Sequence, residues 1–190
     1  MIMNLGVRVD YFSAGGEKTI FTEFDQFFTQ QNSEDREDEA VKVKAKKQVE
    51  VSPRIGISFP ITEQTKFYFN YGHFHQAPQA QFLYRVQEKS FTINRSSISS
   101  IGNPDLPMQR TIAYEVGYEH MFTPNYLFQL SSYSRSVDNQ ISFKSFISND
   151  MIYTLAIPNN YNDIRGLELT LTKTKGRFFK GFFNYTYMDF

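Results

Sequence analysis

Apolar and polar residues alternate with a period of two in segments spread along the chain. The alternation runs through seven segments, at residues 5–11, 54–59, 66–72, 111–122, 128–131, 166–172 and 183–187. Successive side chains of a β-strand point to opposite faces of a sheet, so each segment predicts a strand with one apolar and one polar face. With their flanks, the segments approach the roughly 9–11 residues of a tilted membrane strand. We therefore predict an all-β fold with about seven antiparallel strands.

The connections between these segments alternate between short and long. The short ones lie at 60–65, 123–125 and 175–177, and the long ones cover about 13–48, 74–109 and 138–163. Compact soluble domains rarely contain connections longer than roughly 12–15 residues. Bacterial outer-membrane barrels have tight turns on the periplasmic side and long loops outside. The rhythm predicts a segment of a transmembrane, antiparallel, up-and-down β-barrel, with the long connections outside the cell.

The alternation also assigns side chains to the two faces. The residues expected to face lipid are Phe67, Phe69, Tyr71, Val116, Leu169 and Tyr185. The residues expected to face the lumen are Asn70, Glu115, Gln129, Glu168 and Asn184. Aromatic girdles are expected near strand ends, where Tyr11, Phe12, Phe59, Phe74, Phe122, Tyr126, Phe178 and Phe179 lie. A soluble β-sandwich shows the same alternation because its outer faces are wet, so that fold remains an alternative.

The first long connection has structure of its own. Residues 19–24 and 41–46 keep a partial alternation, and an acidic stretch at 33–39 lies between them. We predict a hairpin above the membrane with its charged tip in solvent. The lysines of 41–46 fit a solvated strand face better than a nucleic-acid site, because an acidic stretch adjoins them.

Composition narrows the range of functions. The formal net charge is +0, from 20 basic and 20 acidic residues, which gives no footprint for nucleic acid. The sequence contains no cysteine, which excludes disulfides, thiolate metal sites and cysteine nucleophiles. No stretch approaches the roughly 18 apolar residues of a membrane helix. The first residues lack the features of a signal peptide, so we expect the chain to start within a longer protein.

Three segments, in order along the chain, resemble one family. Residues 52–79 contain a strand, a turn with Pro60 and Thr62, and a second strand that ends in Tyr71-Gly72-His73-Phe74. Residues 101–106 read Ile-Gly-Asn-Pro-Asp-Leu and precede a Tyr-Glu-Val-Gly-Tyr strand at 114–118, and residues 165–168 read Arg-Gly-Leu-Glu. Together they resemble the barrel of TonB-dependent receptors. The run at 107–110 departs from the Lys-Pro-Glu that often follows in that family.

The resemblance implies that residues 1–190 are a partial receptor barrel with no plug domain and no TonB-pairing box. Such barrels close at about 22 strands, so roughly seven make an incomplete barrel. Phe190 falls on the opposite face from Phe183, Tyr185 and Tyr187, which favours truncation over a natural C-terminus.

The implied function is energy-coupled uptake across the cell outer membrane. The long loops would capture a ligand, and the ligand would pass through the lumen after TonB displaces the plug. The expected partners are outer-membrane lipid, the TonB complex through the missing plug region, and a small-molecule, saccharide or peptide ligand. The sequence does not name the ligand or its contact residues. The alternatives are a passive porin or surface adhesin barrel, and a soluble β-sandwich binding module.

Candidate chemistry is sparse. His73 and His75 share one strand face and are possible metal ligands, but the sequence offers no third ligand nearby. Glu115 and Glu119 share the predicted lumen face, like the two carboxylates of a glycosidase, but a wet charged wall explains them better. We therefore expect no catalytic, metal or cofactor site and a protein that is not an enzyme.

Overall fold

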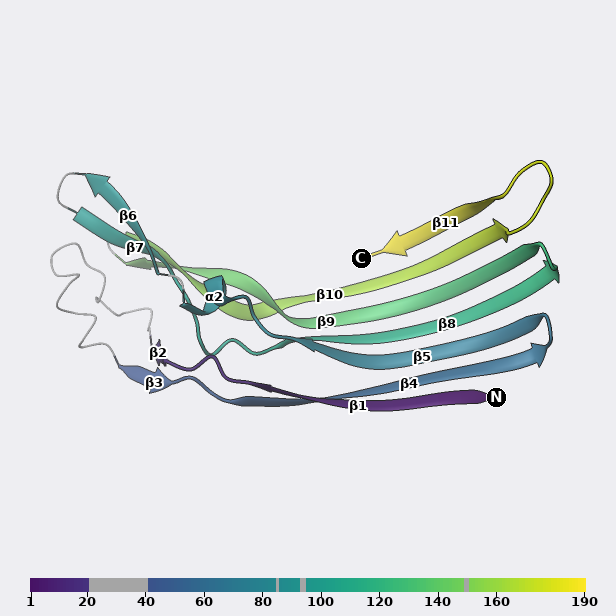
Figure 1. Ribbon diagram of the computed structural model, residues 1–190. Coiled ribbons are helices and arrows are strands. Elements are labelled where there is room, and N and C mark those ends of the chain that lie inside the picture. The colour runs from purple at the N-terminus through teal and green to yellow at the C-terminus, as the bar shows by residue number, and fades with distance from the viewer. Residues whose placement is uncertain (21–40, 85, 93–94, 149–150) are drawn as a thin grey trace.

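The long strands form one open, curved sheet. The structure is a computed structural model, and it describes residues 1–20, 41–84, 86–92, 95–148 and 151–190. Seven long strands dominate it: β1 (Ile2–Phe12), β4 (Gln48–Thr62), β5 (Thr65–Gln76), β8 (Gln109–Thr123), β9 (Tyr126–Ser148), β10 (Met151–Lys173) and β11 (Gly181–Asp189). Each pairs antiparallel with the next long strand along the chain, which gives a simple meander (Figure 1). The predicted all-β, antiparallel architecture is confirmed, and the sheet does not close into a barrel.

The shorter elements all lie at one end of this sheet. They are β2 (Glu17–Thr19), β3 (Lys42–Lys44), α2 (Ala80–Tyr84), β6 (Val86–Thr92) and β7 (Arg95–Ile101). β2 and β3 pair as a separate two-stranded sheet at the base of the predicted hairpin, whose first arm at 21–24 lies outside the described residues. Its acidic tip at 33–39 lies outside the described residues. β7 pairs in parallel with β10, the one departure from the meander that the described strands show.

Tight turns occupy the opposite end, which we call the turn end. β4 joins β5 through two residues after the pair Thr62↔Thr65, and β8 joins β9 through two residues after Thr123↔Tyr126. In each turn the threonine hydroxyl accepts a hydrogen bond from the backbone N–H two residues later. Such local bonds satisfy the turn backbone without help from the rest of the protein. The predicted short connections are confirmed at this end, and the first two predicted long connections lie at the other end (Figure 1).

The prediction of a third long loop, at 138–163, is wrong. β9 and β10 continue through it as paired strands of 23 residues each. At about 3.3 Å per residue each strand spans roughly 75 Å, far more than the hydrocarbon core of a bilayer. The alternation fades in this region because neither face of the extended hairpin carries a continuous apolar stripe. Two register shifts near Pro158 and Asn160, and the positive φ of Asn139 (58°), mark the irregular part.

The two faces of the sheet differ as predicted. Cross-strand pairing places one row of apolar side chains on what we call the apolar face: Phe67, Tyr118, Leu130, Leu169 and Tyr185. Phe69, Tyr71 and Val116 lie on the same face in neighbouring rows. The opposite face, the polar face, carries the row Lys66, Glu119, Gln129, Thr170 and Asn184. Asn70, Glu115 and Glu168 lie on that polar face as well.

The apolar face is bare. Val116 is 53% exposed and Tyr185 is 54% exposed, although both lie in the middle of long strands. In a soluble β-sandwich a second sheet would cover such side chains, and the described chain lays nothing over these two. Among the described residues, no helix is long and apolar enough to cross a membrane.

The buried core is small and lies at the long-loop end. Leu83 of α2, Leu106 and Ala156 of β10 are its buried members, and Phe12 and Ile141 pack against it. Phe12 was predicted to lie in an aromatic girdle, but it points toward this cluster because it pairs with Gln48 on the polar face.

Candidate functional site

The polar face forms a continuous wall of hydrogen-bonding groups. Glu115 of β8 accepts hydrogen bonds from the Tyr68 hydroxyl at 3.2 Å and from the Asn70 amide at 3.3 Å. Glu119, two rows nearer the turn end, forms an ion pair with Lys66 at 2.9 Å. The two glutamates therefore serve separate partners, and their arrangement is that of a charged wall rather than a paired-carboxylate centre.

Glycines let two tyrosine rings lie flat against this wall. Gly117 pairs with Tyr68, and Gly166 pairs with Tyr133. A Cβ atom added at either glycine would overlap the ring of its tyrosine partner. The strand interior therefore uses glycine for close approach of a neighbouring side chain. Flat rings leave the space above the sheet open.

We predict that Gly117→Ala destabilises the barrel, whereas Gly6→Ala does not. Alanine at Gly117 would push the Tyr68 ring off the sheet and break its bond to Glu115, at a cost of about 1–3 kcal/mol. Gly6 lies on the same face of β1, and a Cβ there would meet its nearest heavy atom at 3.9 Å. Urea unfolding of the full-length receptor in lipid measures both. Equal stability of the two variants would show that the ring does not depend on the glycine.

A hollow of about 750 Å³ lies over the middle of the polar face. Asn70, Glu115 and Tyr133 line it from one row of the sheet, and Arg54 and Arg135 line it from the next. Its size falls in the range of roughly 300–1,000 Å³ that is typical of small-ligand sites.

Phe74, also among the residues of this hollow, was predicted to lie in an aromatic girdle. It lies instead on the polar face, under the guanidinium of Arg54 at 4.6 Å.

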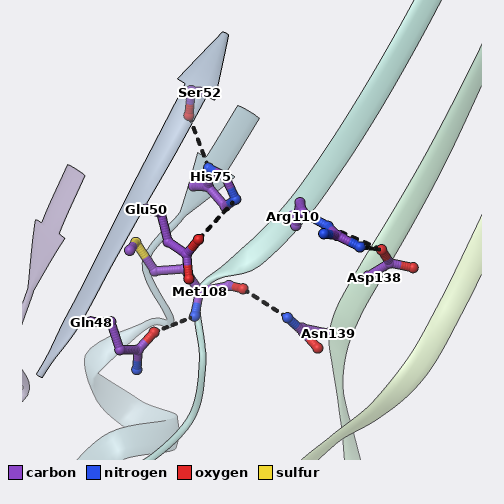
Figure 2. A network of polar contacts seen from close by, with 8 residues as sticks. All are labelled: Gln48, Glu50, Ser52, His75, Met108, Arg110, Asp138 and Asn139. Atoms are coloured by element: carbon purple, nitrogen blue, oxygen red, sulfur yellow. Dashed lines mark hydrogen bonds and ion pairs between the residues drawn. The ribbon is translucent and has the colours of Figure 1, made fainter. Parts of the chain in front are cut away.

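A second, more polar hollow of about 530 Å³ lies nearer the long-loop end. Figure 2 shows the network around it. His75 lies between Ser52, whose Oγ is 2.9 Å from Nδ1, and Glu50, whose Oε2 is 3.6 Å from Nε2. These three residue types also build nucleophilic triads. Here Ser52 is fully buried, so its hydroxyl has no access to a substrate, and the group acts as a tie between β4 and β5.

Gln48 and Asn139 hold the segment that precedes β8. The Gln48 side chain donates to the carbonyl of Leu106 at 2.8 Å and accepts from the N–H of Met108 at 2.9 Å. Asn139 donates to the carbonyl of Met108 at 3.2 Å, and Arg110 forms an ion pair with Asp138 at 2.5 Å (Figure 2). The residues that precede and begin β8 thereby join β4 to β9.

We call residues 101–108 the clasp, because segments far apart in sequence meet there. The Asn103 amide is buried and donates to the carbonyl of Ala156 in β10 at 3.0 Å. Its Oδ1 accepts the N–H of Asp105 at 3.1 Å. Asp105 in turn accepts the N–H of Lys46 at 3.0 Å and pairs with Lys18 of β2 at 3.5 Å. The Gly-Asn-Pro-Asp-Leu string therefore ties the β2–β3 hairpin to the extended β9–β10 hairpin.

The two histidines weighed as metal ligands have separate partners. His73 Nε2 lies 2.6 Å from the hydroxyl of Tyr71, and His75 points toward Ser52 and Glu50. The described part of the chain contains no group of three or more His, Cys, Asp or Glu side chains placed to hold a metal ion.

An open antiparallel sheet with a bare apolar face, a polar wall, tight turns at one end and extended hairpins at the other is a segment of a transmembrane β-barrel. The chain belongs to the TonB dependent receptor-like β-barrel family, whose model matches residues 2–190. No curated protein sequence matches this chain.

Solved structures show the same fold. The hemophore receptor HasR of Serratia marcescens, solved as a double mutant with its hemophore HasA and heme, superposes with a TM-score of 0.54 at 14% identity, over 91% of this chain and 28% of HasR. The copper transporter OprC superposes with a TM-score of 0.54 at 12% identity, over 98% of this chain and 27% of OprC. The chain thus spans little more than a quarter of either protein. The family is one of receptor-like barrels, and the two neighbours are a receptor and a transporter.

Proposed function

We propose that the chain is a wall segment of an outer-membrane receptor that takes up a ligand by coupling to TonB. The observation that carries the proposal is the two-faced sheet. Its apolar face is bare where hydrocarbon would cover it, and its polar face is lined by paired charges and flat aromatic rings, as a water-filled lumen requires. Membership of the receptor family supports the coupling to TonB.

In this proposal the turn end lies in the periplasm and the long-loop end lies outside the cell. The clasp, the β2–β3 hairpin and the extended β9–β10 hairpin then form part of the outer rim that meets the ligand. The wall around Glu115 lines the path that the ligand follows. The partners are outer-membrane lipid on the apolar face, the TonB complex through the rest of the receptor, and a small-molecule, saccharide or peptide ligand.

Fractionation and TonB binding test this function. The full-length receptor is expected in the outer-membrane fraction, with slower migration in gels after boiling, as barrel proteins show when they unfold. Purified receptor is expected to bind the periplasmic domain of TonB, measured by calorimetry. A receptor in the outer membrane that does not bind this domain would contradict energy coupling and favour a passive porin or an adhesin. A receptor that stays soluble without detergent would favour the β-sandwich module.

A further inference from the structure

Two arginines flank a shallow depression in the wall. Strand pairing places Arg54, Gly72, Ala113 and Arg135 in a single cross-strand row on the polar face. At about 4.8 Å per strand, the Cα atoms of the two arginines are roughly 14 Å apart. Between them, Gly72 leaves room for the Phe74 ring, whose nearest atom lies 3.1 Å from where a Cβ at Gly72 would stand, and Ala113 adds only a methyl group. We call this row the arginine trough, and the hollow of about 750 Å³ lies above it.

Aromatic rings hold both guanidinium groups. Arg54 Cζ lies 4.6 Å from the centroid of the Phe74 ring, and Arg135 Cζ lies 5.1 Å from the centroid of the Tyr133 ring. Stacking on a ring fixes the plane of a guanidinium but leaves its N–H donors free at the edges. Both side chains are therefore oriented before any ligand arrives.

Neither guanidinium has a carboxylate partner within the residues that the structure describes. Other cations of the polar face do: Arg8 pairs with Asp10 at 2.6 Å, and Lys66 pairs with Glu119 at 2.9 Å. The acid in the row next to the trough, Glu115, is engaged by Tyr68 and Asn70. Two cations against one acid leave the trough with a net positive charge.

We propose that the arginine trough binds a small polyanion with at least two carboxylate or phosphate groups. Planar guanidinium groups bind such groups through paired, charge-assisted hydrogen bonds. The trough lies next to Tyr71 and Tyr114, and further toward the long-loop end the same face of β5 and β8 carries His75 and Arg110. This inference rests on the proposed function, because that function places the trough near the outer mouth, where a ligand first meets the wall.

Calorimetry with citrate tests the trough on the full-length receptor in detergent. Sodium citrate, free of iron, supplies three carboxylates, and its neutral triethyl ester is the matched probe without charge. The receptor is expected to bind citrate and not the ester, and binding is expected to weaken as salt is added. Arg54→Gln and Arg135→Gln are each expected to weaken citrate binding about tenfold, and together about a hundredfold.

Arg8→Gln is the control, since it removes the same charge from the same face at a residue that already has a partner. It is expected to leave citrate affinity unchanged. A receptor that binds citrate no better than its ester overturns the proposal, as does an equal loss in all three single variants. Unchanged citrate affinity with a lower unfolding midpoint in the trough variants also overturns it, because the arginines would then hold another part of the receptor. TonB binding by the same preparations separates a failure of the trough from a failure of the proposed function.

Discussion

Leu169→Arg is expected to destabilise the intact barrel by about 2–4 kcal/mol, because it places a charge in the hydrocarbon near the middle of the bilayer. Leu169 lies in the apolar row, between Leu130 and Tyr185. Arginine at the neighbouring Thr170 is expected to cost much less. Thr170 lies on the polar face between Gln129 and Asn184, where water solvates the guanidinium.

Folding of the full-length receptor into lipid vesicles, followed by urea titration, measures both variants. The pair is well matched because the two residues are adjacent in one strand, at nearly the same depth. Only the face differs between them. Equal free energies of unfolding for the two variants would contradict the assignment of faces.

Leu106→Ala is expected to open the long-loop end without unfolding the membrane part. Leu106 is fully buried in the small core with Leu83 and Ala156, and truncation of such a side chain costs about 2–5 kcal/mol. That core is local, so the loss is expected as faster hydrogen exchange in the clasp and the β2–β3 hairpin. Exchange in the strands near Leu130 is expected to stay unchanged.

Val43→Ala in β3 is the control for Leu106→Ala. It also shortens an apolar side chain at the long-loop end, but Val43 is 48% exposed and contributes little burial. Mass-spectrometric exchange on the intact receptor compares the two variants. If Leu106→Ala leaves exchange in the clasp as slow as in the unaltered receptor, the core does not hold the rim together.

The strands and their faces could be predicted because lipid-facing strands repeat a simple physical rule. Each residue such as Phe67 or Val116 alternates with a polar neighbour, and that alternation survives without knowledge of strand pairing. The same rule failed for 138–163, where β9 and β10 stay paired but have no continuous apolar stripe. Backbone hydrogen bonds maintain a hairpin regardless of its hydropathy, so the sequence pattern had no signal there.

The face on which Phe74 lies can be predicted from the sequence. It lies four residues after Asn70 in one strand, so period-two counting alone puts both on the polar face. Nearness to a strand end, which favours a girdle position, does not fix the face on which a side chain lies. The structure adds Arg54, whose guanidinium covers the ring.

The trough and the clasp depend on strand register, which one sequence does not reveal. Arg54 and Arg135 each look like an ordinary polar residue of an alternating strand. They lie in one cross-strand row only because Gly72 of β5 and Ala113 of β8 are in register between them. Likewise, the string at 101–106 resembles a family motif, but its hydrogen bonds to Lys46 and Ala156 join segments far apart in the chain.

The contact between the apolar face and lipid is the central claim, and spin-label accessibility tests it most directly. Single cysteines carrying nitroxides, placed one at a time at 114, 115, 116, 118 and 119 in a cysteine-free full-length receptor in lipid, report collisions with oxygen and with a polar nickel chelate. Oxygen is expected to collide most often with the labels at 114, 116 and 118, and the chelate with the labels at 115 and 119. The two accessibilities are therefore expected to alternate along the strand with a period of two. If the labels at 114, 116 and 118 are shielded from both reagents, another layer of protein covers that face, and the receptor wall described above is wrong.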